Sequence, residues 1–276
     1  RGMSSAASDV YKRQSIFFAL KIILGNTMKT DFNKIISVLA ISALPAFAVA
    51  DNAFSGFQAG ATMGYEDVSM DWEADSFLAP VLPPTTIAPT GDDSESLDDS
   101  AFAYGVFSGY NFAINEKWII GAELAFQDSD ISDSLDSIPG IGPNNTSAKV
   151  QVNASYLLGV KGGYLINESL MAYSTLSATL TEVESSSACP SDGSLCNPGS
   201  PARSDKDDDD ITGWALALGV EKSLTDNLSV RAEYRYAELG TAELTAIDME
   251  PGEAVGADVD VDVKSQTLQI GAAYKF

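Results

Sequence analysis

Six charged residues could do chemistry together, because each lies on the polar side of a segment whose polarity alternates along the chain. They are three carboxylates and three cations: Glu123, Lys161, Glu221, Arg231, Glu233 and Arg235. Paired carboxylates can exchange protons with a substrate, and charges along a polar interior can form an ion path. Buried charges must be paired, so we expect Arg231 and Arg235 to neutralise the glutamates, with Glu221 the surest partner. We favour a salt-bridge plug over an ion gate.

Other kinds of active chemistry have little support in the residues. The chain contains no histidine, which excludes a Ser-His-Asp relay. Acidic runs at residues 207–210 and 258–262 could hold Ca²⁺ or Mg²⁺ through carboxylate oxygens. Neither run has the spacing or the glycine of an EF-hand loop, so we interpret both as solvated outer loops. We therefore expect no catalytic residue, no cofactor and no metal site.

About eight segments with a period of two must position the six charges. Each alternates an apolar residue with a polar or small one, and they span residues 57–65, 102–112, 118–126, 150–164, 170–180, 213–221, 228–236 and 268–276. The fourth segment is expected to place Val150, Val152 and Tyr156 on one apolar face. In the fifth, Met171 and Tyr173 interrupt the alternation. The last segment ends on Tyr274 and Phe276, two aromatic residues of its apolar face.

The connections between these segments alternate in length. Residues 113–117, 166–168 and 224–227 are short turns, whereas residues 68–100, 129–147, 186–210 and 239–260 are long and acidic. This alternation predicts an antiparallel up-and-down meander with both termini on one side. A soluble sandwich or a lipocalin-like barrel is the alternative, but those folds are apolar inside and charged outside. The sequence therefore predicts an all-β transmembrane barrel of about eight strands, with short periplasmic turns and long outer loops.

The amino-terminal part of the chain predicts export. Residues 28–50 combine a short basic stretch, an apolar run too short to span a bilayer and small residues before Asp51, as secretory signals do. We expect residues 1–27 to be a non-native extension and residues 51–276 to be the barrel domain. The formal net charge of −23 argues against nucleic-acid binding and against docking on anionic lipid.

Two cysteines, Cys189 and Cys196, lie in one segment rich in Ser, Gly and Pro. In an exported chain the default expectation is a local disulfide. A zinc site would need a histidine or a second cysteine pair, and free thiols are the remaining alternative. We predict a bridge at the tip of an outer loop, where its loss would matter little to the barrel.

Three stretches resemble a known family. They are residues 213–221 (GWALALGVE), residues 224–236 (LTDNLSVRAEYRY) and the carboxy-terminal strand at residues 268–276 (LQIGAAYKF). The first two resemble the closing hairpin of bacterial outer-membrane β-barrels of the opacity-type, OmpA-like and OmpX-like porin family. The third resembles the assembly signal of such barrels, which would assign that role to Tyr274 and Phe276.

The resemblance implies a location in the outer membrane of a Gram-negative cell envelope. The implied partners are outer-membrane lipid, lipopolysaccharide and the barrel-assembly machinery; surface ligands stay unspecified. Lipid A deacylases and omptin-type proteases are built on similar barrels, but they depend on histidine, so an enzyme is not expected. We expect a structural or adhesion-like role through the outer loops, with a narrow cation-preferring channel as the alternative.

Overall fold

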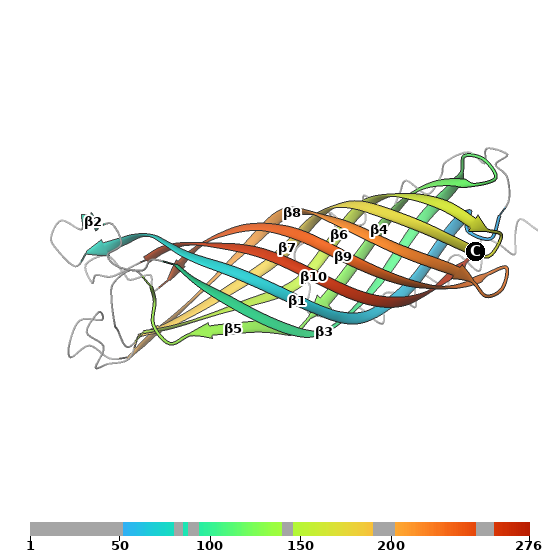
Figure 1. The fold of residues 1–276 in the computed structure, drawn as a ribbon. Helices are drawn as coiled ribbons and strands as arrows, with labels where there is room; N and C mark the ends of the chain where they lie inside the picture. The colour runs from blue at the N-terminus through green and yellow to red at the C-terminus, as the bar shows by residue number, and fades with distance from the viewer. Residues whose placement is uncertain (1–51, 80–84, 88–93, 140–145, 190–201, 247–256) are drawn as a thin grey trace, which may run out of the picture. The chain divides into compact units, whose positions relative to one another are not determined.

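Ten strands build the part of the chain that the structure describes. The computed structural model describes residues 52–79, 85–87, 94–139, 146–189, 202–246 and 257–276 (Figure 1). The strands are β1 (Gly56–Ala79), β2 (Thr85–Ile87), β3 (Ser94–Ala113), β4 (Trp118–Ser129), β5 (Ile131–Leu135), β6 (Ser147–Asn167), β7 (Leu170–Cys189), β8 (Arg203–Ser223), β9 (Leu228–Ala246) and β10 (Ala257–Lys275). The predicted leader lies outside the described residues, and so does Cys196.

Eight of these strands close into an antiparallel ring, which confirms the predicted fold. The order is β10-β9-β8-β7-β6-β4-β3-β1, and β10 pairs with β1 to complete the circle. The closing ladder runs from the pair Gln58 and Lys275 to the pair Phe77 and Ala257. Strand β2 pairs with the end of β1, and β5 pairs with β6. The ring leaves no free edge where all eight strands are paired, as a lipid environment requires.

The three predicted short turns join β3 to β4, β6 to β7 and β8 to β9 at one end of the ring. The beginning of β1 and the end of β10 lie at the same end of the ring. There the amide of Phe276 donates to the carbonyl of Phe57 at 3.0 Å. The rings of these two aromatic residues lie 5.5 Å apart.

Each predicted long loop contains strand residues. Strand β1 has 24 residues and β6 has 21, whereas about 9–11 residues of tilted strand cross a bilayer. Residues 68–79, 94–100, 203–210 and 257–260, which we expected in loops, continue the strands away from the short turns. The ring therefore extends well beyond the thickness of a membrane.

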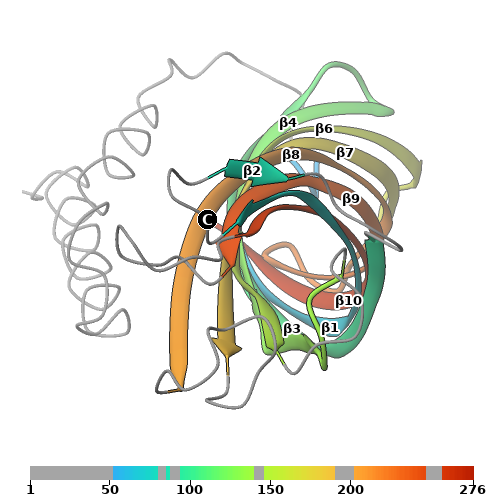
Figure 2. The same cartoon turned by 90° about the vertical axis from the view of Figure 1, so that its left-hand side faces the viewer.

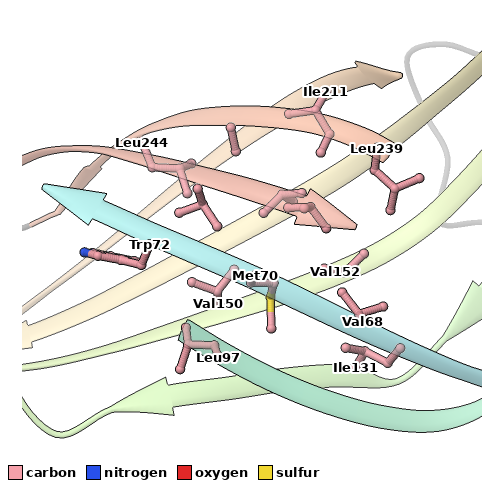
Figure 3. Packing of buried hydrophobic residues seen from close by; sticks show 14 of the residues in the cluster. Val68, Met70, Trp72, Leu97, Ile131, Val150, Val152, Ile211, Leu239 and Leu244 are labelled. Atoms are coloured by element: carbon pink, nitrogen blue, oxygen red, sulfur yellow. The ribbon is translucent and has the colours of Figure 1, made fainter. Parts of the chain in front are cut away.

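The polarity of the ring inverts along its length. Near the short turns, outward side chains are apolar and exposed, such as Met63 at 54% and Leu268 at 66%; we call this part the membrane half. Farther along, the outward positions of the same strands carry acidic residues such as Asp67, Asp208 and Asp262; we call this part the distal half. Its inside is apolar, with Trp72 fully buried (Figure 3). The distal half thus has the polarity pattern of a water-soluble protein, with a polar exterior and an apolar core.

That core unites side chains from eight strands. It contains Val68, Met70, Trp72 and Ala74 of β1, Leu97 of β3, Ile131 and Leu135 of β5, Ala148, Val150 and Val152 of β6, Val183 of β7, Ile211 of β8 and Leu239, Ala242 and Leu244 of β9, joined by Val259, Val261 and Val263 of β10.

Among the described residues, the distal half is two facing sheets. The ladder between β8 and β9 begins at the pair Trp214 and Glu238, so residues 203–213 of β8 pair with β7 alone. The ladder between β3 and β4 ends at the pair Ala103 and Ser129, and β5 then pairs with β6. Two seams result, one between β8 and β9 and one between β3 and β5. Figure 2 shows the ends of β7 and β8 standing apart from the curl of β9, β10 and β1.

A β-bulge in β9 explains the seam between β8 and β9. In β9, Val263 pairs with Gly240 and Lys264 with Glu238, so Leu239 is an extra residue, and Gly240 has a φ of 118°. A bulge bends its strand and increases the local twist, which turns β9 away from β8.

A second β-bulge lies in β6, where residues 153 and 154 stand between the paired residues Val152 and Ser155. This bulge reverses the parity, so Val150 and Val152 are buried inside the ring. Our expectation that they share an outward face with Tyr156 is wrong.

Candidate functional site

Two cations meet one carboxylate in the middle of the membrane half. The Nζ atom of Lys161 on β6 lies 2.5 Å from Oε2 of Glu123 on β4. The guanidinium of Arg231 on β9 reaches the same carboxylate from across the lumen, with Nη1 at 3.0 Å from Oε2 and 3.2 Å from Oε1. It also lies over the ring of Phe107, 3.4 Å from the centroid. All three charged side chains are buried, so the pairing compensates their loss of water.

A second carboxylate, Glu233, is held by three donors. Nη2 of Arg235 donates to it at 2.9 Å, Nε2 of Gln269 at 2.7 Å and the hydroxyl of Tyr173 at 2.9 Å. Nη1 of Arg235 in turn donates to Oε1 of Gln127 at 2.8 Å. Glu233 is therefore satisfied by one cation and two neutral groups.

Glu221 does not take the expected place. Its Oε1 accepts from the hydroxyl of Ser229 at 2.6 Å, and its Oε2 has no hydrogen-bond partner among the described residues. Arg231 lies opposite it in the β8–β9 ladder, but its guanidinium crosses the lumen to Glu123. Within the described chain no cation pairs with Glu221, so our expectation that it is the surest partner of an arginine is wrong.

Apolar layers close the charged layer on both sides. Toward the short turns lies a small cluster of buried side chains: Phe54, Ile119, Leu165, Met171 and Tyr173. On the other side lies the distal core. Between them, a cavity of about 10 Å³ is lined by residues that include Glu123, Thr175 and Glu233. This cavity has roughly the room that one water molecule needs.

Residues before β1 complete the apolar layer that lies toward the short turns. The amide of Phe54 donates to Oδ1 of Asn52 at 3.0 Å, which forms a tight turn. Nδ2 of Asn111 donates to the carbonyl of Phe54 at 3.0 Å, and Nζ of Lys275 donates to the carbonyl of Asn52 at 3.1 Å. These bonds hold Phe54 inside the ring. Sequence analysis missed this contact and the inward role of Met171 and Tyr173, which we had described as interruptions of the pattern.

Carboxylates face one another on the outside of the distal half. In the β7–β8 ladder Glu182 stands opposite Asp210, and Glu184 stands opposite Asp208. Partial burial raises the pKa of Glu182 above its ordinary value, and the carboxylates of Asp210 and Asp208 raise it further. Lys206 forms an ion pair with Glu184. Like charges directly opposite each other weaken a sheet.

Aspartate side chains bridge both seams. Oδ2 of Asp209 on β8 accepts from the amide of Glu243 on β9 at 3.2 Å. Oδ2 of Asp99 on β3 accepts from the amide of Ser132 on β5 at 2.9 Å. A single side-chain acceptor thus replaces a backbone ladder at each seam. In the described chain no three His, Cys, Asp or Glu side chains are grouped to hold a metal ion.

No helix formed by the described residues is long and apolar enough to be a membrane span. Cys189 is the last residue of β7, but its predicted partner lies outside the described residues, so the disulfide stays a prediction.

A closed antiparallel ring with an apolar belt outside and paired charges inside is the architecture of an outer-membrane barrel. The family model for the outer membrane protein beta-barrel domain matches residues 36–276, and the chain belongs to this family. It is therefore an outer-membrane protein of the Gram-negative type.

The relatives agree with this assignment. A 31 kDa outer-membrane immunogenic protein of Brucella melitensis is 28% identical over 187 residues, which are 66% of this chain and 70% of that protein. Among solved structures, the outer membrane protease OmpT of Escherichia coli is 11% identical, with a TM-score of 0.47 over 85% of this chain and 100% of that one. OprG of Pseudomonas aeruginosa is 14% identical, with a TM-score of 0.45 over 82% and 100%. Both TM-scores are below 0.5, so the family assignment rests on the family model and not on these structures.

Proposed function

We propose that this protein is a closed, non-enzymatic barrel. Its acidic distal half stands above the outer membrane as a rigid head for contact with other molecules. The observation that carries the proposal is the inversion of polarity along the strands. An apolar belt and aromatic residues such as Trp118 and Tyr274 suit lipid, and acidic outward residues such as Asp67 and Asp208 suit water. Seven continuous strands, β1, β3, β6, β7, β8, β9 and β10, connect the two zones, so the distal half is held by the barrel itself.

The filled lumen argues for a closed barrel. Ion pairs around Glu123 and Glu233 occupy its middle, and apolar layers lie on both sides. A narrow cation-preferring channel is the second candidate, and the polar character of the middle layer favours it. Such a channel would have to displace both apolar layers, which include Trp72 and Phe54.

The relatives support surface exposure. The name of the Brucella melitensis relative describes that protein as an outer-membrane immunogenic protein, and by analogy we propose that this chain is exposed at the cell surface. Lipid and lipopolysaccharide around the apolar belt, and the barrel-assembly machinery during insertion, are the partners that we propose for the membrane half.

Conductance in planar bilayers tests the closed state. The purified protein, folded in detergent and checked by its heat-modifiable migration, is added to the bilayer beside an established porin as a control for insertion. We expect no steady current from this protein at any modest voltage. A steady cation-selective current from folded protein would establish the channel instead.

Labelling on whole cells tests the exposed head. In a background with Cys189 and Cys196 replaced by serine, Asp208→Cys in the distal half should react with a membrane-impermeant maleimide. Ser223→Cys, beside a short turn, should react only after the cells are lysed. The reverse pattern would contradict the proposed orientation.

A further inference from the structure

Strand β8 has an edge that pairs with no strand of the described chain. Residues 203–213 form a ladder with β7 on one side and no backbone ladder on the other. Strand β9 still lies beside residues 209–213, where the carboxylate of Asp209 accepts from the amide of Glu243, so the edge that can take another strand is residues 203–208. An unpaired edge presents a row of backbone donors and acceptors to another chain, and proteins usually cover or blunt it. Here the edge belongs to the distal half, outside the apolar belt, where a partner in water can reach it.

The charges beside this edge oppose each other. On the outward face of β7 and β8, Glu182 stands opposite Asp210 and Glu184 opposite Asp208. Lys206 relieves part of this repulsion, since its Nζ pairs with Glu184. No cation of the described residues forms an ion pair with Asp208 or Asp210. The face is therefore repulsive within the fold, in a way that added cations would relieve.

We propose that the edge of β8 binds an extended segment of a basic protein by strand addition, with lysine or arginine at every second position. In such a ladder, side chains of the added strand alternate between the two faces. Those on the outward face would stand beside Asp208 and diagonal to Asp210. Lys206 forms its ion pair with Glu184 across such a diagonal, since its direct ladder partner is Ser186. Backbone hydrogen bonds would supply the register, and the alternating cations would supply the selectivity.

A second copy of this chain is the less suitable occupant. Pairing two β8 edges would bring two runs of four aspartates, residues 207–210, against each other, and like charges directly opposite destabilise a ladder. The acidic exterior of the distal half opposes such approach further. Charge complementarity thus selects a cationic partner over self-association.

This inference rests on the proposed surface-exposed role and names the kind of partner. Its test uses the folded full chain in detergent and a ten-residue fluorescent peptide that alternates lysine and threonine. We expect binding that weakens with salt, measured by fluorescence anisotropy. We also expect slower hydrogen exchange at backbone amides of residues 203–208. A peptide of alternating glutamate and threonine should not bind.

Three comparisons separate strand addition from simple attraction between charges. The lysine peptide with N-methylated backbone at every second residue keeps its charge but loses donors, and it should bind at least about tenfold more weakly. The double variant Asp208→Asn with Asp210→Asn should bind the unmodified lysine peptide on the order of fivefold more weakly. The matched control, Asp67→Asn with Glu73→Gln, removes the same charge from β1, which is paired on both sides, and should change little.

Each outcome decides the proposal. Equal binding of the methylated peptide, equal losses in the two double variants, or concentration-dependent self-association without peptide binding would overturn it. Circular dichroism and heat-modifiable migration verify that every variant is folded. A closed barrel by conductance with no peptide binding would reject this inference alone, whereas a conducting barrel would reject the proposed function separately.

Discussion

Glu233 shows how a carboxylate is kept inside the ring without access to water. Its oxygens accept from Arg235, Gln269 and Tyr173, which come from three different strands. Replacing Arg235 with alanine would leave the carboxylate with two neutral donors and Gln127 without its guanidinium donor. We expect a loss of roughly 3–5 kcal/mol in the free energy of unfolding, measured by urea titration of the protein refolded in detergent.

The double variant Glu233→Gln with Arg235→Met is the control for that loss. Replacing both members of a buried pair avoids a stranded charge and is often nearly neutral, so most of the stability should return. If Arg235→Ala alone costs less than about 1 kcal/mol, water screens the lumen, and the filled interior that supports a closed barrel is not maintained in solution.

A different residue-scale effect concerns Glu182 on the outer face of β7. Partial burial and the carboxylates of Asp210, Asp208 and Glu184 raise its pKa in the folded chain. The folded state then binds more protons than the unfolded state, so stability falls as pH rises. We expect Glu182→Gln to be more stable than the wild type at about pH 7, by roughly 0.2–1 kcal/mol. The advantage should vanish as the pH falls toward the ordinary glutamate pKa of about 4.3.

Unfolding curves of both proteins across this pH range provide the check, with Ser186→Ala as a neutral substitution on the same strand. An advantage of Glu182→Gln that is constant with pH would show that the repulsion described here does not act on Glu182.

Residue parity alone places the six charges inside, but it cannot assign their partners. Period-two alternation puts Glu123 and Arg231 on the inner face of their strands. Whether a guanidinium pairs with its ladder neighbour or crosses the lumen depends on ring diameter and stagger, which are properties of the closed ring. This is why Arg231 reaches Glu123 and leaves Glu221 with Ser229. Met171 broke the predicted pattern because it faces inward in an apolar layer.

At the scale of elements, the bulge in β9 creates the seam beside β8. Gly240 has a φ of 118°, and a Cβ there would lie 2.6 Å from the carbonyl oxygen of Thr212. We expect Gly240→Ala to lower the free energy of unfolding by about 1–3 kcal/mol, because it adds both strain and overlap. Chemical unfolding in detergent micelles measures the change.

Gly162 on β6 is the matched control for that substitution. A Cβ at Gly162 meets nothing within 4 Å, and alanine in a strand interior loses less entropy on folding than glycine does. Gly162→Ala should therefore be neutral or slightly stabilising. Equal effects of the two substitutions would mean that the bulge does not require its glycine.

The strands of the membrane half could be predicted because lipid enforces a strict alternation of apolar and polar residues. Their distal continuations were taken for loops, since the apolar residues change face there. In β1 the apolar set moves from odd positions such as Tyr65 to even positions such as Val68 and Trp72. The solvent outside changes from lipid to water while the strand continues. A search for one apolar face per segment cannot find such a strand, although the alternation itself is present in the sequence.

On the scale of the whole molecule, closure of the ring is one long ladder between β1 and β10. Its pairing extends from the membrane half into the distal half, so the same two strands complete the barrel and one of the two facing sheets. Strand β10 follows the other ring strands along the chain, and the ring stays open until it pairs with β1. Its contacts at the end of the ladder are therefore where assembly of the whole molecule can be interrupted.

Tyr274 and Phe276 are placed to act on that step. Both are exposed on the lipid-facing side, their rings lie 5.0 Å apart, and Phe276 also contacts Phe57 across the closure. Replacing both with serine removes interfacial aromatic groups but leaves the backbone ladder possible. We expect a several-fold lower yield of heat-modifiable protein in the outer membrane. Tyr65→Ser with Phe102→Ser, which removes two exposed aromatic residues away from this end, should reduce the yield much less. If the two double variants lose yield equally, general lipid contact explains the effect, and the carboxy-terminal strand carries no special signal for assembly.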